Sequence, residues 1–180
     1  MTEPRLSPDD RAPAALAHAG AGADTSPVVL VELLFFAYRD FIGEPDRLLA
    51  RYGFGRAHHR VLHFVNRNPG LTVAELLSIL DITKQSLGRV LRDLVAGGLI
   101  EQRAGAEDRR QRLMYLTAAG MELAGDLLAL QSARVRRAIE QVPPAHRAWV
   151  KVFLAGLLES DRLDDVARLT QTALDLDGAH

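Results

Sequence analysis

The 180-residue chain contains no cysteine. That absence excludes disulfide bonds, thiolate metal sites and a cysteine-based redox switch. Long apolar runs are missing as well, because no segment reaches the roughly 20 apolar residues that a membrane-spanning helix needs. The N-terminus also lacks a basic stretch followed by an apolar core, which is the pattern of a signal peptide. We therefore expect a cytoplasmic protein that has no membrane partner.

The net charge of the whole chain is close to zero, at −1. The charge is nevertheless uneven along the sequence. Seven Lys or Arg residues and four acidic residues lie from Thr83 to Arg112, whereas six acidic residues and two arginines lie from Glu159 to His180. A locally basic segment in a nearly neutral chain indicates a nucleic-acid contact confined to that segment.

Both ends of the chain differ in composition from the middle. Residues 1–27 are rich in Ala, Gly, Pro and Asp and contain four acidic residues and two arginines. We expect them to form a disordered or loosely ordered arm, because an arm that grips DNA would be basic. Residues 161–180 form an acidic C-terminal segment. One domain is expected to span residues 28–160, a length sufficient for a core and an added dimerisation element.

The stretch Leu71–Thr117 has the pattern of two short helices followed by a hairpin. Thr72 and Glu75 have the spacing of a capping box, in which a hydroxyl and a carboxylate bond backbone N–H groups at the start of a helix. That helix should run to Leu80, and Thr83 is a suitable N-cap for a second helix after a two-residue turn. A short helix, a tight turn and a second helix are typical of DNA-binding helix-turn-helix motifs.

The second helix sorts its residues onto two faces. Apolar residues at helical spacing predict a buried stripe, formed by Leu87, Val90, Leu91, Leu94 and Val95. The opposite face has three cations, an amide and a glycine, contributed by Lys84, Gln85, Gly88, Arg89 and Arg92. A cationic face without a carboxylate suits a groove lined with phosphates and base edges.

Two segments after the second helix alternate as strands do. Leu99–Arg103 and Arg112–Leu116 flank a polar tip, so they predict a hairpin, or wing, directly after the helix-turn-helix. Arg109 and Arg110 would be the cations of this tip. The expected fold class is therefore mainly α (α+β), with a winged helix-turn-helix core, a DNA-binding lobe at about residues 56–117, and flanking dimerisation helices.

The segments on either side of this core are strongly apolar. Val28–Ile42 is apolar on nearly all sides and is expected to end at Gly43 and Pro45. A long helix should begin after Thr117 and run to about Gln141. A last helix carries a broad apolar stripe, whose members are Trp149, Val150, Phe153, Leu154, Leu157 and Leu158. Since a monomer of this size can hardly bury all of these surfaces, we expect a homodimer held by helices from both ends of the chain.

His59 and His63 are four residues apart, a spacing with which a helix can chelate a metal ion. No carboxylate or thiol pattern accompanies them, so a structural role is favoured over a metal site, and His58 is no better supported. No nucleophile motif or phosphate-binding loop supports a hydrolase or metal enzyme built on these histidines. We expect neither catalysis nor a cofactor. A second alternative is a winged-helix protein-interaction module, which would present an acidic or apolar face where this sequence has a basic one.

With these features, the chain resembles the MarR family of bacterial transcription regulators over roughly Val28–Leu158. The most specific part of the resemblance is the run ITKQSLGRVLRDLVAGGLIEQRAGAEDRRQRLMYLTAAG. The family's Asp-x-Arg wing pattern fits Asp108-Arg109-Arg110-Gln111-Arg112. The resemblance implies a homodimer on double-stranded DNA, with a recognition helix in the major groove and a wing arginine in the minor groove. The protein is expected to be a repressor that acts on a pseudo-palindromic operator.

The resemblance places the DNA contacts on the second helix and on the wing. The residues concerned are Thr83, Lys84, Gln85, Ser86, Gly88, Arg89, Arg92, Arg109, Arg110 and Arg112. Gln85 is suited to pairing with adenine, and Gly88 either lets a DNA backbone approach closely or is a tolerated surface glycine. We expect Arg92 to bond to Asp108 and so hold the wing against the helix, and Arg109 to be the wing-tip contact.

The resemblance also implies a small-molecule effector that weakens DNA binding from a pocket between the dimerisation helices and the DNA-binding lobe. The candidate lining residues are Tyr38, Phe41, His58, His59 and His63. The expected effector is an aromatic acid or a phenol, held by apolar walls and oriented by a few His and Arg side chains. The family's cysteine-based oxidation sensors are excluded by composition.

Overall fold

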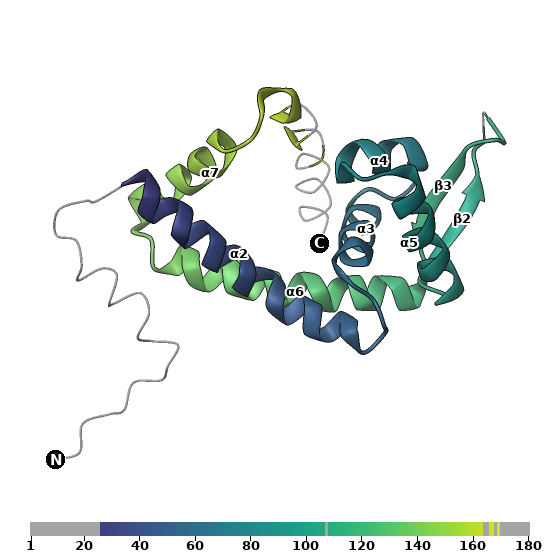
Figure 1. Ribbon diagram of the computed structural model, residues 1–180, viewed down its shortest axis with the longest axis horizontal. Coiled ribbons are helices and arrows are strands. Elements are labelled where there is room, and N and C mark those ends of the chain that lie inside the picture. The colour runs from purple at the N-terminus through teal and green to yellow at the C-terminus, as the bar shows by residue number, and fades with distance from the viewer. Residues whose placement is uncertain (1–25, 107, 164–165, 168, 170–180) are drawn as a thin grey trace, which may run out of the picture.

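The computed structural model describes residues 26–106, 108–163, 166–167 and 169 (Figure 1). Its elements follow in the order α2 (Pro27–Ala50), α3 (Arg56–Arg67), β1 (Leu71–Thr72), α4 (Val73–Leu80), α5 (Lys84–Ala96), β2 (Ile100–Ala104), β3 (Arg112–Leu116), α6 (Ala118–Glu140), η1 (Pro144–His146), α7 (Arg147–Gly156) and η2 (Ser160–Arg162). The mainly α class with a small sheet is confirmed. The predictions for residues 1–27 and 161–180 lie almost entirely outside the described residues.

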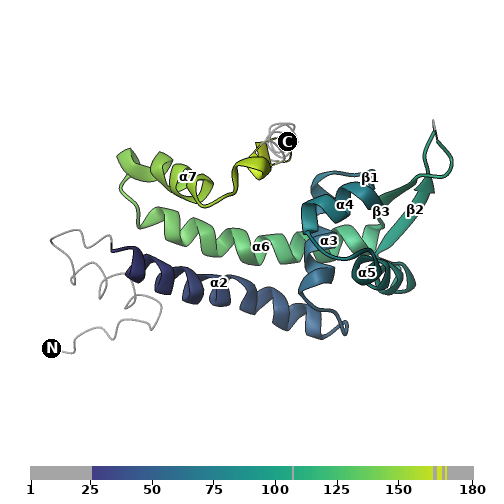
Figure 2. The same ribbon diagram turned by 45° about the horizontal axis from the view of Figure 1, so that its top comes forward.

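Two long helices form the spine of the molecule. α2 and α6 pack against each other and run in opposite directions (Figures 1 and 2). A lobe made of α3, α4, α5 and the sheet lies at the start of α6, whereas α7 lies beside its far end. This lobe and α7 are therefore at opposite ends of the same spine.

Helix α2 is longer than the sequence predicts. It passes through Gly43 and Pro45 and ends at Ala50. A proline inside a helix removes one backbone hydrogen bond and costs roughly 3 kcal/mol. Here Pro45 and Leu49 are buried against the rest of the protein, and this packing offsets the local cost. The chain turns only afterwards, where Gly53 adopts a φ of +71° that suits glycine.

The helix-turn-helix forms as the sequence predicts. The Thr72 hydroxyl oxygen accepts from the Glu75 backbone N–H at 3.2 Å, and the Glu75 carboxylate accepts from the Thr72 backbone N–H at 2.8 Å. Asp81 ends α4 in the left-handed region, with a φ of 51°. The Thr83 hydroxyl oxygen then accepts from the Ser86 backbone N–H at 3.2 Å and caps α5. Local side-chain bonds therefore fix both ends of the turn.

The sheet contains one strand that the sequence analysis did not predict. The antiparallel order is β1-β3-β2, and Leu71 of β1 pairs with Met114 of β3. A two-residue strand has no periodicity to detect. It forms because Gly70, with a φ of +90°, donates its backbone N–H to the Met114 carbonyl oxygen at 2.8 Å and brings the chain alongside β3.

One hydrophobic core holds the lobe to the start of α6. Its fully buried members come from α2, α3, α4, α5, β3 and α6 and include Leu49, Val61, Leu62, Val65, Leu76, Leu80, Leu87, Leu94, Met114 and Leu127. Val95, which the sequence assigns to the buried stripe of α5, is instead exposed. It lies one residue before the end of the helix and lines an open hollow together with Val73 and Gln102.

Candidate nucleic-acid interface

The polar face of α5 is open to solvent. Lys84, Gln85, Arg89 and Arg92 are all exposed. Thr83 and Ser86 are also exposed, but their hydroxyl groups bond to each other at 2.9 Å as part of the N-cap. Within the described residues, Lys84, Arg89 and Arg92 form no ion pair. This face therefore keeps its positive charge available for an external anion.

Gly88 lies in the middle of that face. A Cβ atom added at this position would meet no other atom within 4 Å. The protein's own packing therefore does not require glycine at position 88. A close approach by a DNA backbone and a tolerated surface glycine both remain compatible with this geometry.

The wing is shaped by Asp108. Its carboxylate accepts from the Arg110 backbone N–H at 2.9 Å, and its carbonyl oxygen accepts from the Gln111 backbone N–H at 3.0 Å. The Gln111 carbonyl oxygen in turn accepts from the Gly105 backbone N–H at 3.1 Å and closes the loop. Asp108 thus folds the tip and presents the side chains that follow it.

The expected bond between Arg92 and Asp108 is not formed, although the structure describes both residues. The wing extends away from α5, as Figure 1 shows, because two five-residue strands carry its tip beyond the helix. Arg92 instead lines a hollow of about 630 Å³ together with Lys84, Gly88 and Gln102. The Asp108 carboxylate accepts a hydrogen bond within the wing. It therefore shapes the tip by contacts inside the hairpin and not through a bond to α5.

The basic side chains of the wing differ in what they do. Arg103 pairs with Glu101 and lies over the Tyr115 ring, 4.4 Å from its centroid. Arg112 donates to the Arg109 carbonyl oxygen at 3.4 Å. Both are therefore partly engaged in holding the hairpin. The side chains of the remaining two wing cations, Arg109 and Arg110, are exposed and take part in no ion pair within the described chain.

Helix α3 is tied to both helices of the helix-turn-helix. Arg60 Nη2 donates to the Leu80 carbonyl oxygen at the end of α4, at 2.7 Å. His58 Nε2 lies 3.3 Å from Asp93 Oδ2 on α5, and its Nδ1 accepts from the Gly55 backbone N–H at 3.2 Å. These two contacts span 20 and 35 residues of sequence, which is why the sequence pattern did not reveal them.

A hollow lies where the sequence analysis expects the effector pocket. A hollow of about 280 Å³ lies between α2, α3 and α6 and is lined by Tyr38, Phe41, Ile42, Arg56, His59, Arg60, His63, Phe64 and Gln131. Four of the five predicted residues line it, but His58 does not. Its ring stacks on Phe54, with centroids 4.7 Å apart, and points to α5 because it occupies a different face of α3.

Burial favours the neutral form of the two histidines of this hollow. Burial lowers the pKa of His59 below its usual 6.5, against the opposing effects of Asp46 and of a hydrogen bond with Gln131. Burial also lowers the pKa of His63, and His59 and Arg67 add to that effect. In the part of the chain that is described, no group of three or more His, Cys, Asp or Glu side chains could hold a metal ion.

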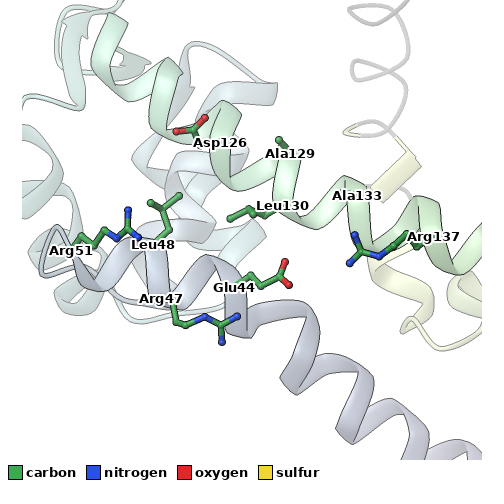
Figure 3. A pocket seen from close by; sticks show the side chains of 9 residues that line it. All are labelled: Glu44, Arg47, Leu48, Arg51, Asp126, Ala129, Leu130, Ala133 and Arg137. Atoms are coloured by element: carbon green, nitrogen blue, oxygen red, sulfur yellow. The ribbon is translucent and has the colours of Figure 1, made fainter. Parts of the chain in front are cut away.

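A second, larger hollow was not predicted. It has a volume of about 660 Å³ and lies between α2 and α6 (Figure 3). Arg47 approaches it from the last turn of α2, Arg51 from just after that helix, and Arg137 from α6, around a floor that includes Ala129 and Ala133. The spacing of Arg47 and Arg51, four residues apart, was the only signal in the sequence. Beside it, Glu44 and Arg134 form an ion pair at 2.9 Å that links the two helices.

Comparisons with known proteins decide the family. The sequence model described as MarR family matches residues 52–111. The chain is also similar to the HTH-type transcriptional regulator PetP of Rhodobacter capsulatus, at 46% identity over 129 residues that cover 72% of this chain and 78% of that protein. The chain belongs to the MarR family. It is therefore a transcriptional regulator with a DNA-binding winged helix, and the hydrolase or metal-enzyme alternative is excluded, because MarR regulators are not enzymes.

Solved structures of MarR regulators share this fold. Staphylococcus aureus MepR in its DNA-binding conformation matches with a TM-score of 0.62 at 18% identity and covers 71% of this chain and 95% of that chain. The Mycobacterium tuberculosis MarR family protein Rv2887 in complex with p-aminosalicylic acid matches with a TM-score of 0.51 at 26% identity, covering 71% and 97%. None of the helices in the described MarR chain is long and apolar enough to cross a membrane.

Proposed function

We propose that this MarR protein is a homodimeric repressor that binds a pseudo-palindromic operator with α5 and the wing. The observation that carries the proposal is the α5 face formed by Lys84, Gln85, Arg89 and Arg92, which is exposed, cationic and not ion-paired within the described chain. A face of this kind favours phosphates and base edges over a protein surface. This basic charge argues against a protein-interaction module that does not bind DNA.

The two basic elements have different tasks in this proposal. α5 enters the major groove, where Gln85 is suited to a bidentate contact with adenine and Arg89 to guanine or phosphate. Arg109 and Arg110 reach the neighbouring minor groove or its phosphates from the tip that Asp108 shapes. Phosphate contacts position the protein, and base contacts select the sequence.

The dimer is supported by apolar surface at the end of the spine that is remote from the lobe. In the single chain, Val28, Phe35 and Phe36 of α2 and Trp149 and Phe153 of α7 are exposed. Contiguous exposed apolar surface marks an interaction site in a folded protein. A two-fold axis through these helices repeats the lobe, so we expect two half-sites about one helical turn, ~10 bp, apart.

An aromatic acid is the proposed effector. The hollow between α2, α3 and α6 offers the rings of Tyr38, Phe41 and Phe64 as walls and two arginines as cations. Neutral His59 and His63 suit the hydroxyl or ring edge of such a ligand better than a second charge. The neighbour Rv2887 was solved with p-aminosalicylic acid, which makes this compound the natural first probe.

Fluorescence anisotropy on DNA from upstream of the protein's own gene tests the proposal. We expect tight, salt-dependent binding by the wild type and at least tenfold weaker binding by Arg89→Ala. Arg136→Ala removes another exposed arginine, from α6 outside the proposed DNA interface, and is the matched control that should bind normally. If the wild type binds this DNA no more tightly than unrelated DNA, the proposal that the DNA contains its operator is wrong. If Arg89→Ala and Arg136→Ala lose the same amount of affinity, the proposed role of α5 is wrong.

A further inference from the structure

Arg60 takes part in the effector hollow and in the helix-turn-helix at the same time. Its side chain lines the hollow between α2, α3 and α6. Its Nη2 atom also donates to the carbonyl oxygen of Leu80, the last residue of α4, at 2.7 Å. One side chain therefore connects the site proposed for the effector to the turn that leads into α5.

The Leu80 carbonyl group needs such a donor. The last carbonyl groups of a helix have no partner within the helix, and a positive charge near them is favourable. α4 has no basic residue in its own last turn, so the charge comes from α3. Asp81, which follows directly, holds a φ of 51°, in the left-handed region that few residues besides Gly, Asn and Asp adopt, and its carboxylate accepts from Arg162 at 3.0 Å. The Arg60 bond is thus part of what fixes the direction in which α5 begins.

Arg60 is also the cation in the hollow that a carboxylate can recruit. Arg56 is held by the Asp46 carboxylate at 3.0 Å, and His59 and His63 are neutral. Arg60 is held by a neutral carbonyl oxygen. A carboxylate adds a negative charge and a second acceptor oxygen that the carbonyl group lacks, and it can accept two parallel hydrogen bonds from one guanidinium, so a ligand carboxylate competes well for Arg60.

We propose that Arg60 is the positioning residue through which an acid in the hollow controls the recognition helix. The acid draws the guanidinium away from Leu80, the end of α4 loses its donor, and α5 leaves the position that matches the operator. By linkage, operator binding must weaken acid binding by the same factor. This inference rests on the proposed effector site and adds the residue that transmits its occupancy.

The first test needs no effector. In the full-length protein, hydrogen exchange of the turn between α4 and α5 is compared in the wild type, Arg60→Met and Arg56→Met. Arg60→Met keeps the length of the side chain but cannot donate, so exchange at residues 81–83 should rise severalfold. Arg56→Met changes a second arginine of the same hollow and should leave the turn as it is. Arg60→Lys keeps a cationic donor and should restore most of the protection. An unchanged turn in Arg60→Met would overturn the proposal.

The second test separates coupling from a merely structural role. p-Aminosalicylate should weaken operator binding by the wild type at least fivefold, and by Arg60→Met less than twofold. The analogue 3-aminophenol lacks the carboxylate and should release neither protein. Equal release of Arg60→Met and wild type would overturn the role of Arg60. A wild type that binds its operator but is not released would contradict the proposed effector instead, and the exchange measurement alone would then decide whether Arg60 holds the turn.

Discussion

A Cβ atom at position 120 would lie only 2.0 Å from the carbonyl oxygen of Leu99. Gly120 is in the first turn of α6, and Leu99 directly precedes β2. Thr117 completes the contact, since its backbone N–H donates to the Leu99 carbonyl oxygen at 3.0 Å and its hydroxyl to the Gly98 carbonyl oxygen at 2.6 Å. The base of the wing is therefore fixed to the start of the spine helix, and only glycine fits at the point of closest approach.

Replacement of this glycine should separate the wing from the spine. Gly120→Ala is expected to destabilise the fold by about 1–3 kcal/mol, the usual cost of overpacking, because the obstacle is backbone and cannot rotate away. Gly125→Ala is the matched control on the same helix, since nothing lies within 4 Å of its added Cβ atom, and it should gain up to ~1 kcal/mol. Urea unfolding of both variants measures the difference. Equal stabilities would show that the Leu99 contact relaxes without cost.

Gln85 and Arg109 should have separable effects on DNA binding. Gln85→Ala removes a base contact worth ~1–3 kcal/mol of discrimination, so it should bind matched and mismatched operators more equally. Arg109→Ala removes a wing cation and should weaken binding to every sequence, with a shallower dependence on salt. Titrations of both variants on matched and mismatched operators at two salt concentrations decide the matter. A uniform loss in Gln85→Ala would reverse this assignment of roles.

The exposed apolar end of the spine predicts how the dimer can be broken. Phe35 is 73% exposed in the single chain, and Phe35→Asp should shift the protein to a folded monomer at micromolar concentration because it places a charge in the proposed interface. Met121→Asp is the control, since it changes another exposed apolar residue, 55% accessible, at the start of α6 near the lobe. Light scattering of both variants gives the answer. A wild type that is already a folded monomer would contradict the homodimer.

The neutral histidines predict a loss of stability in acid. Because burial lowers the pKa of His59 and His63 below the 6.5 of the unfolded chain, the unfolded state binds more protons below that pH. Their contribution to stability is therefore complete above pH 6.5 and falls as the pH decreases toward the lowered values. Urea midpoints at pH 7.5 and 5.5 should differ less in the double variant His59→Gln/His63→Gln than in the wild type. Identical pH dependence in both proteins would show that these groups titrate normally.

The elements that the sequence determined are those with local causes. The capping box of Thr72 and Glu75 and the N-cap of Thr83 depend on bonds between residues three apart, and the structure forms both. The periodicity of α5 likewise placed Leu87 and Leu94 in the core and Lys84 and Arg89 on the surface. Such signals need only the geometry of one helix, so they can be read before the rest of the chain is placed.

What the tertiary structure decided depends on contacts between distant residues. Pro45 stays helical because Leu49 is packed in the core, and β1 exists because Gly70 reaches Met114. His58 turns to Asp93 and not to the effector hollow, while Arg60 turns to Leu80. In each case a local preference competes with packing or with a hydrogen bond between residues 20 to more than 40 positions apart. The outcome depends on how the helices pack against one another, which the local sequence does not determine.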